Sequence, residues 1–225
     1  MTFSLVVRDG DRFGIAGSSS SPAVAARIAH LRPGVGAASS QNITDPMLGV
    51  ALLDGLVEHG DAERALAGVT GDPRHEKTIA YRQLTVLGRT GPGFAYSGPH
   101  TLGTYATATT EGAVAAGNML SGTHIPGVLL QAYEEATGEL EERLVAAMKA
   151  AVAAGGEEGP VHSAGLSVVA DVGWRVTDLR IDWADDPIDR LGELLDVWLP
   201  QRDDYVTRGL DPASSPSYGV PGDER

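Results

Sequence analysis

The chain begins with two strand-like segments that are joined by a short acidic turn. Residues 2–8 and 12–18 form apolar runs of the β type, and Asp9-Gly10-Asp11 lies between them. An Asp-Gly pair between two such runs is a strong indication of a β-hairpin, because these residues accept the backbone angles of a tight turn. The pattern therefore predicts that the chain opens with two antiparallel strands.

Further strands and helices are predicted in groups along the chain. Strands are expected at residues 78–87, 91–96, 105–109, 113–118, 164–171 and 175–183. Helices are expected at residues 46–60, 61–69, 126–137, 139–154 and 187–198. Asp45-Pro46 and Asp186-Pro187 each provide an aspartate and a proline of the kind that typically starts a helix. Hairpins and helix pairs grouped in this way predict an α+β protein, with antiparallel sheets covered by helices.

The length fits one domain followed by a polar tail. A chain of 225 residues can bury a core of its own, and we expect a single domain over residues 1–199. From Pro200 onward the sequence is polar and contains Pro, Ser, Gly and Asp, so residues 200–225 are predicted to be extended or disordered.

Charge and composition exclude several classes of function. The net charge of −13 argues against nucleic-acid binding, which needs a positive surface. The chain has no cysteine, which excludes disulfides, thiolate metal sites and cysteine nucleophiles. Neither a signal peptide nor an apolar run of about 18 residues is visible, so we expect a cytoplasmic protein that does not engage a membrane.

Sequence motifs for cofactors and metals are also absent. There is no phosphate-binding glycine-lysine motif, and Gly34-x-Gly36 lacks the third glycine of a dinucleotide fingerprint. The histidines are scattered, with no pair at metal-ligand spacing on a predicted helix. We therefore expect neither a cofactor nor a metal.

Thr2 is the candidate nucleophile. Methionine aminopeptidases generally remove a Met that precedes a small residue, and loss of Met1 would give Thr2 both a hydroxyl and a free α-amine. An amino-terminal threonine supplies its own base, because its α-amine has an unperturbed pKa of roughly 7.7–8.0. Many chains begin with Met-Thr and make no use of it, so the hypothesis needs support from other residues.

Three further polar residues are candidates for the same site. Gln41 ends a small-residue stretch, Asn118 ends an apolar strand, and Ser19 belongs to a run of serines. For Gln41 the alternative to catalysis is a buried hydrogen-bonding role. For Asn118 the alternative is a turn residue that tolerates positive φ.

Several short motifs occur in a characteristic order along residues 2–195. They are Thr2-Phe3-Ser4-Leu5-Val6, Gly14-Ile15-Ala16-Gly17-Ser18-Ser19, Gly34-Val35-Gly36-Ala37-Ala38-Ser39-Ser40-Gln41, Arg82-Gln83, Gly117-Asn118-Met119-Leu120, Ser163-Ala164, and Asp178-Leu179-Arg180-Ile181-Asp182 with Asp186-Pro187. In this order they resemble the motifs of the DUF1028 proteins, an uncharacterised branch of the N-terminal nucleophile (Ntn) hydrolase superfamily.

The resemblance implies a four-layer αββα sandwich of two antiparallel sheets and hydrolysis of an amide or related C–N bond. It implies Thr2 as nucleophile, Asn118 as oxyanion donor, and Ser19 and Gln41 as residues that orient the amine or the substrate. Ser163 is a further substrate-binding candidate.

One position departs from the pattern of the family. Many relatives carry a basic residue after the serine of the second strand, where this chain has Ser20. Arg27 or Arg32, in the segment that follows, is therefore expected to supply the charge and to bind substrate.

Three functions remain open on the sequence alone. The first is a hydrolase that acts on a small polar metabolite. The second is a catalytically silent Ntn-fold protein that binds a small molecule or a partner in the same cleft. The third is an oligomeric scaffold, and since the helical faces of such sandwiches often pack together, we expect a homo-oligomer.

Overall fold

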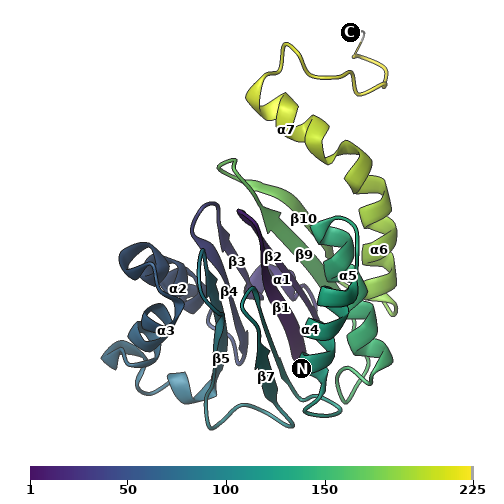
Figure 1. Ribbon diagram of the computed structural model, residues 1–225. Helices are drawn as coiled ribbons and strands as arrows, with labels where there is room; N and C mark the ends of the chain where they lie inside the picture. The colour runs from purple at the N-terminus through teal and green to yellow at the C-terminus, as the bar shows by residue number, and fades with distance from the viewer. Residues whose placement is uncertain (224–225) are drawn as a thin grey trace.

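Two antiparallel sheets lie at the centre of the computed structural model, which describes residues 1–223 (Figure 1). The larger sheet has six strands, in the spatial order β10 (Arg175–Ile181), β9 (Ser163–Val169), β2 (Arg12–Ser19), β1 (Thr2–Asp9), β8 (Ala113–Asn118) and β7 (Ala106–Thr109). The smaller sheet has four strands, in the order β3 (Ala29–Arg32), β4 (Gly36–Asn42), β5 (Arg82–Gly88) and β6 (Phe94–Ser97).

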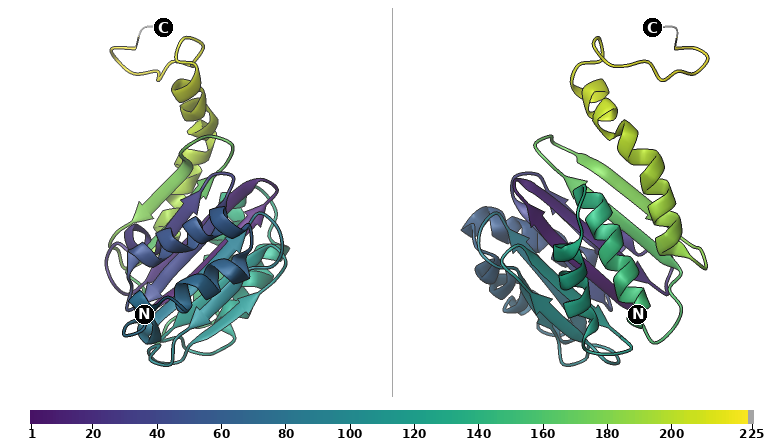
Figure 2. Two further views of the ribbon diagram at one scale, coloured as in Figure 1. Left: turned by 90° about the vertical axis from the view of Figure 1, so that its left-hand side faces the viewer. Right: turned by 45° about the vertical axis from the view of Figure 1, so that its right-hand side comes forward.

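Helices cover the outer face of each sheet. Against the smaller sheet pack α2 (Pro46–His59) and α3 (Ala62–Thr70). Against the larger sheet pack α4 (Ile125–Glu135), α5 (Leu140–Ala153) and α6 (Pro187–Trp198). Figures 1 and 2 show the two helical layers on opposite sides of the paired sheets. The predicted α+β class and the αββα layering are confirmed.

The opening hairpin forms as predicted. β1 and β2 pair from Phe3 with Ser18 to Asp9 with Arg12. Gly10 has a φ of +60°, in the left-handed region that glycine adopts without a steric penalty.

The two predicted helix starts in the first half of the chain are also confirmed. The Asp45 side chain accepts a hydrogen bond from the Met47 N–H at 3.0 Å, at the start of α2. The Asp61 side chain accepts one from the Arg64 N–H at 2.8 Å, at the start of α3. Each carboxylate thereby satisfies a backbone donor that the helix cannot.

The alternation of side chains along β1 determines where its polar residues point. Phe3 and Leu5 belong to the core beneath the helices, whereas Val6 belongs to the core between the sheets. Because side chains alternate between the two faces of a strand, Thr2 and Ser4 point toward the smaller sheet, as Val6 does. The interior between the sheets is therefore apolar around Val6 and polar at the amino-terminal end of β1.

Helix α1 (Ala25–Ile28) and strands β3 and β4 form where no helix or strand was predicted, and one strand is shorter than predicted. Helix α1 leads directly into β3 within the Ser/Gly/Pro-rich passage. A 3-10 turn, Ile79–Tyr81, occupies the start of the strand predicted at residues 78–87, and β5 begins only at Arg82.

The prediction of an extended or disordered segment from Pro200 is wrong for its first part. A 3-10 turn continues α6 into α7 (Arg202–Leu210), which projects from the body of the molecule (Figure 1). Residues 211–223 contain turns but neither helix nor strand. The assignment of residues 1–199 to a single domain stays a prediction.

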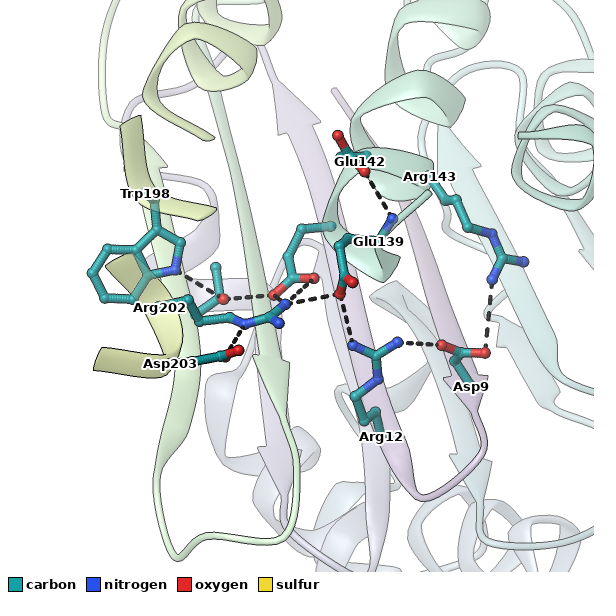
Figure 3. A network of polar contacts seen from close by, with 10 residues as sticks. Asp9, Arg12, Glu139, Glu142, Arg143, Trp198, Arg202 and Asp203 are labelled. Atoms are coloured by element: carbon teal, nitrogen blue, oxygen red, sulfur yellow. Dashed lines mark hydrogen bonds and ion pairs between the residues drawn. The ribbon is translucent and has the colours of Figure 1, made fainter. Parts of the chain in front are cut away.

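Contacts with the body explain the unexpected helix. The Arg202 guanidinium lies 3.0 Å from a Glu139 carboxylate oxygen and 3.3 Å from both oxygens of Glu141 (Figure 3). The Trp198 and Tyr205 rings stack with centroids 5.2 Å apart. Such tertiary contacts are what stabilise a short helix in a protein, and local composition does not reveal them.

Candidate active site

A cleft of about 570 Å³ opens at the amino-terminal end of β1. Segments 1–2, 21–28 and 41–44 contribute its walls. Thr2 lines this cleft, although its exposed fraction is only 7%. The candidate nucleophile is therefore held in the wall of a hollow large enough for a small molecule.

A chain of polar groups joins Thr2 to a cation in the same cleft. The Thr2 hydroxyl donates to the Met1 carbonyl at 2.5 Å and lies 3.4 Å from the Ser19 hydroxyl. The Ser19 hydroxyl also contacts the Met1 carbonyl and lies 2.9 Å from the Ser21 hydroxyl, to which Arg27 Nη2 donates at 3.0 Å. The structure thus brings the predicted residues Ser19 and Arg27 to Thr2, and it adds Ser21.

Asn118 is the direct cross-strand partner of Thr2, in the pairing of β8 with β1. Its amide nitrogen donates to Gln83 Oε1 at 3.0 Å, and Gln41 Nε2 donates to the same oxygen at 2.8 Å. Gln83 Nε2 in turn donates to the Gly117 carbonyl at 3.0 Å. Gln83, which the sequence marked only as part of a motif, is therefore the junction that holds the other two amides.

The amide network is buried and well connected. Gln41 Oε1 accepts from the Ser4 hydroxyl at 2.6 Å and from the Ser39 hydroxyl at 3.2 Å. Gln41 and Asn118 are each only 1% exposed, and Gln83 is fully buried. Buried polar groups that are satisfied in this way hold a fixed orientation. The network therefore makes Asn118 a rigid neighbour of Thr2.

Ser163 supports the wall of the cleft through its contacts with the chain after Ser20. Its hydroxyl donates to the Ser21 carbonyl at 2.6 Å and accepts from the Val24 N–H at 3.2 Å. Ser163 is fully buried, so its hydroxyl shapes the loop and does not face the cleft.

Arg32 does not reach the site. It pairs with Gly36, at the opposite end of β4 from Gln41, and its Nη2 lies 2.8 Å from Asp54 Oδ1 on the surface. The strand β3 runs away from the cleft. Arg27, which precedes β3, therefore lies at the cleft, whereas Arg32, at the far end of β3, does not. The expectation that Arg32 binds substrate is therefore corrected, because Arg32 does not reach the cleft.

Glu157 is a site residue that the sequence analysis missed. It lies in the loop between α5 and β9 and is only 5% exposed. Its Oε2 accepts from the Ser20 N–H at 3.2 Å, whereas its buried Oε1 has no hydrogen-bond partner among the described residues. Burial raises the pKa of Glu157 to about 8, and the Met1 α-amine and the Ser20 N–H oppose that rise.

Two glycines and two backbone contacts hold the Glu157 loop beside Asn118. Gly155 and Gly156 have φ values of +117° and +54°, which side chains rarely adopt. Glu157 forms a backbone bridge with Leu120, and the Glu158 N–H donates to the Met119 carbonyl at 3.0 Å. In the sequence nothing distinguishes Glu157 from its exposed neighbour Glu158, because only the fold buries one of them.

Neither a cluster of metal ligands nor a membrane-spanning helix is found in the described part of the chain. Within residues 1–223, no group of three or more His, Asp or Glu side chains is arranged to hold a metal ion. In the same residues, no helix combines the length and the apolar character needed to cross a bilayer.

Comparison with known proteins identifies the relatives of the chain. The model of a family of unknown function, DUF1028, matches residues 2–191. The crystal structure of protein SPO2555 from Silicibacter pomeroyi, a DUF1028 protein, superposes with a TM-score of 0.79 at 28% identity, over 87% of this chain and 88% of that one. No match is found among curated proteins.

More distant likenesses are found among solved structures. HslV from Trypanosoma brucei has a TM-score of 0.47 at 15% identity, over 74% of this chain and 98% of that one. An Anbu mutant from Hyphomicrobium sp. strain MC1 has a TM-score of 0.48 at 12% identity, over 89% and 96%. At these scores the site has to be interpreted from its own geometry.

Proposed function

The chain belongs to the DUF1028 family, and we propose that it is an Ntn-type amidohydrolase that cleaves an amide or related C–N bond of a small polar metabolite. One observation carries the proposal. Thr2 lies in the wall of a cleft, 3.4 Å from the Ser19 hydroxyl and directly across the strand pair from Asn118. Removal of Met1 would turn this threonine into an amino-terminal nucleophile.

The chemistry requires only Thr2 and a donor for the oxyanion. The Thr2 oxygen attacks the substrate carbonyl carbon while the Thr2 α-amine takes the hydroxyl proton. The new C–O bond makes a tetrahedral intermediate, and as the C–N bond breaks, the ammonium returns that proton to the leaving nitrogen. Water then hydrolyses the ester and releases Thr2.

Asn118 is the proposed oxyanion donor. An amide nitrogen carries two hydrogens, of which one is donated to Gln83. The second hydrogen can stabilise the negative oxygen of the intermediate, because Gln83 holds the amide in place before the substrate arrives.

Arg27 suggests the charge of the substrate. Its guanidinium contacts the Ala23 carbonyl at 3.1 Å and the Ser21 hydroxyl at 3.0 Å. No carboxylate of the described residues forms an ion pair with it, although the chain carries a net charge of −13. We therefore propose a substrate with a carboxylate or another anionic group, which Arg27 binds at the rim of the cleft.

The remaining properties follow the sequence predictions. We propose that the protein works in the cytoplasm as a homo-oligomer, without a cofactor or metal.

A catalytically silent binding protein is the second candidate. With Met1 in place, the Met1 carbonyl accepts the Thr2 hydroxyl hydrogen bond, and the Thr2 nitrogen is a peptide nitrogen that cannot act as a base. The same cleft would then bind its ligand without cleaving it.

The state of Thr2 separates the two candidates. An intact mass of the purified protein shows whether Met1 is lost, and periodate then oxidises only a chain whose amino-terminal threonine has a free amine. Retention of Met1 in fully active protein would exclude Thr2 as the base.

Hydrolysis is tested with a panel of small amides, with and without a carboxylate. We expect turnover by the wild type and by Thr2→Ser, which keeps a hydroxyl and an amine, and none by Thr2→Ala. Thr109→Ala, at an exposed position of β7, is the control. Equal turnover by the wild type and Thr2→Ala would overturn the proposal.

A further inference from the structure

We infer that Glu157 is a positioning residue for the Thr2 α-amine, which it orients as a hydrogen-bond acceptor and stabilises as the ammonium that forms during attack. The inference rests on the proposed function, because it concerns the protein after removal of Met1. It assigns a task to a buried carboxylate that the chemistry described above does not use.

The register of the opening hairpin brings Glu157 to the amino-terminal end of β1. Phe3 pairs with Ser18, so Thr2 lies beside Ser19, in keeping with the 3.4 Å between their hydroxyls. The residue that follows β2 is Ser20, whose N–H donates to Glu157 Oε2 at 3.2 Å. The carboxylate is therefore anchored one strand position from Thr2, on the side where the chain begins.

The second carboxylate oxygen of Glu157 can accept a hydrogen bond. Glu157 Oε1 is buried and has no hydrogen-bond partner among residues 1–223, whereas Oε2 is held by a backbone N–H. Buried acceptors without a partner are uncommon, and each one calls for an explanation. An amine at the start of β1 supplies the missing donor.

Met1 contacts both the loop that carries this carboxylate and the cleft. The Met1 side chain packs against the Glu157 loop, where a Cβ placed on Gly159 would come within 3.0 Å of Met1 Cε. Met1 is also one of the residues that line the cleft. Its removal would enlarge the cleft toward the loop and turn the new Thr2 amine toward Glu157.

The electrostatic interaction between Glu157 and the Thr2 α-amine supports the positioning role of Glu157. The charged group that acts on Glu157 is the α-amine of the first residue, while Ser20, just after β2, contributes its N–H and Leu120 forms a backbone bridge with Glu157. Attack converts the amine of Thr2, a residue only 7% exposed, into an ammonium, which burial alone disfavours. As the pH rises through about 8, Glu157 becomes ionised and offsets that cost, and it does so only after the proton has moved.

Glu157→Gln tests the inference, with Glu158→Gln as the matched control. Glutamine keeps an acceptor for the Ser20 N–H but cannot carry the negative charge, and Glu158 is an exposed neighbour in the same loop. The first readout is the pH dependence of acetylation of the Thr2 amine by acetic anhydride, followed by peptide mass spectrometry. The chain has lysines only at Lys77 and Lys149, so the amino-terminal peptide is easily distinguished.

We expect the acetylation midpoint of Glu157→Gln to lie about one pH unit below that of the wild type, because loss of a nearby opposite charge lowers the pKa of an amine. Above both midpoints, where the Thr2 amine is unprotonated in both proteins, turnover of the best amide found in the panel should fall up to about tenfold in kcat with KM nearly unchanged, since one pH unit corresponds to a tenfold equilibrium change in the basicity of the amine. Glu158→Gln should match the wild type in both measurements.

The outcomes separate this inference from the proposed function. If Thr2→Ala is inactive and Glu157→Gln matches Glu158→Gln in both readouts, the role of Glu157 is overturned while the proposed function stands. If Thr2→Ala keeps full turnover, the proposed function itself fails.

If Glu157→Gln does not fold, a second measurement tests the inference. In wild-type protein labelled with ¹³C at the glutamate carboxyls, acetylation of the Thr2 amine should raise the pH at which Glu157 titrates. An unchanged titration would overturn the inference.

Discussion

Thr2 and Asn118 are direct cross-strand partners at the ends of the antiparallel strands β1 and β8. Directly opposed residues point to the same face of a sheet, with Cβ atoms about 4.5–5.5 Å apart. Backbone pairing alone therefore holds the hydroxyl and the amide together. A slip of one residue in this register would send one of them to the opposite face of the sheet.

Asn118→Ala should remove the proposed oxyanion donor. We expect kcat to fall about 10²–10³-fold, with a much smaller change in KM, because the lost hydrogen bond forms only in the transition state. Steady-state kinetics on an amide substrate of the wild type checks this. Gln131→Ala, an exposed amide on α4, is the control, and a similar loss in both variants would contradict the assignment.

Gln83→Ala should destabilise the whole protein. The change deprives the amide nitrogens of Gln41 and Asn118 of their common acceptor, and a buried polar group left unsatisfied costs about 1–3 kcal/mol. We expect the free energy of unfolding to fall by several times RT, measured by urea titration. Loss of only a few tenths of a kcal/mol, as expected for Gln131→Ala, would show that the network is unimportant.

Arg202→Ala should weaken the attachment of α7. Glu141 is fully buried, and the guanidinium of Arg202 forms an ion pair with it at 3.3 Å. Leaving such a carboxylate without its partner is expected to cost about 3–5 kcal/mol. Arg190→Ala is the control, because its ion pair with Asp186 is exposed and is expected to contribute only about 0–1 kcal/mol.

The stability of the protein should depend on the ionisation of Glu157. Because burial raises the pKa of this carboxyl to about 8 from 4.5, the folded protein binds more protons than the unfolded chain between these values. Stability should therefore fall as the pH rises from about 5 to 8. The difference in unfolding free energy between Glu157→Gln and the wild type should grow in favour of the variant over that range, and a constant difference would contradict the assignment.

Local patterns in the sequence were sufficient to predict the strands β1, β2 and β8 at the site, but they did not predict α1 and β4, which also line the cleft. The Asp-Gly turn, the aspartates at the starts of α2 and α3, and the extent of β8 depend on neighbouring residues in the chain, and each is confirmed. The helix over Arg202–Leu210 was missed because it depends on Glu139 and Glu141, some 60 residues earlier.

Thr2 could be proposed as the nucleophile from the sequence, by its chemistry and by the resemblance of the motifs, since an amino-terminal threonine needs no distant partner to serve as its own base. Only the tertiary structure decided which charged residues lie near it. It brought Arg27 to the cleft and carried Arg32 away from it, because strand direction determines which end of β3 lies nearby. It also buried Glu157 and exposed Glu158, because desolvation depends on how distant segments pack and not on the identity of the residue.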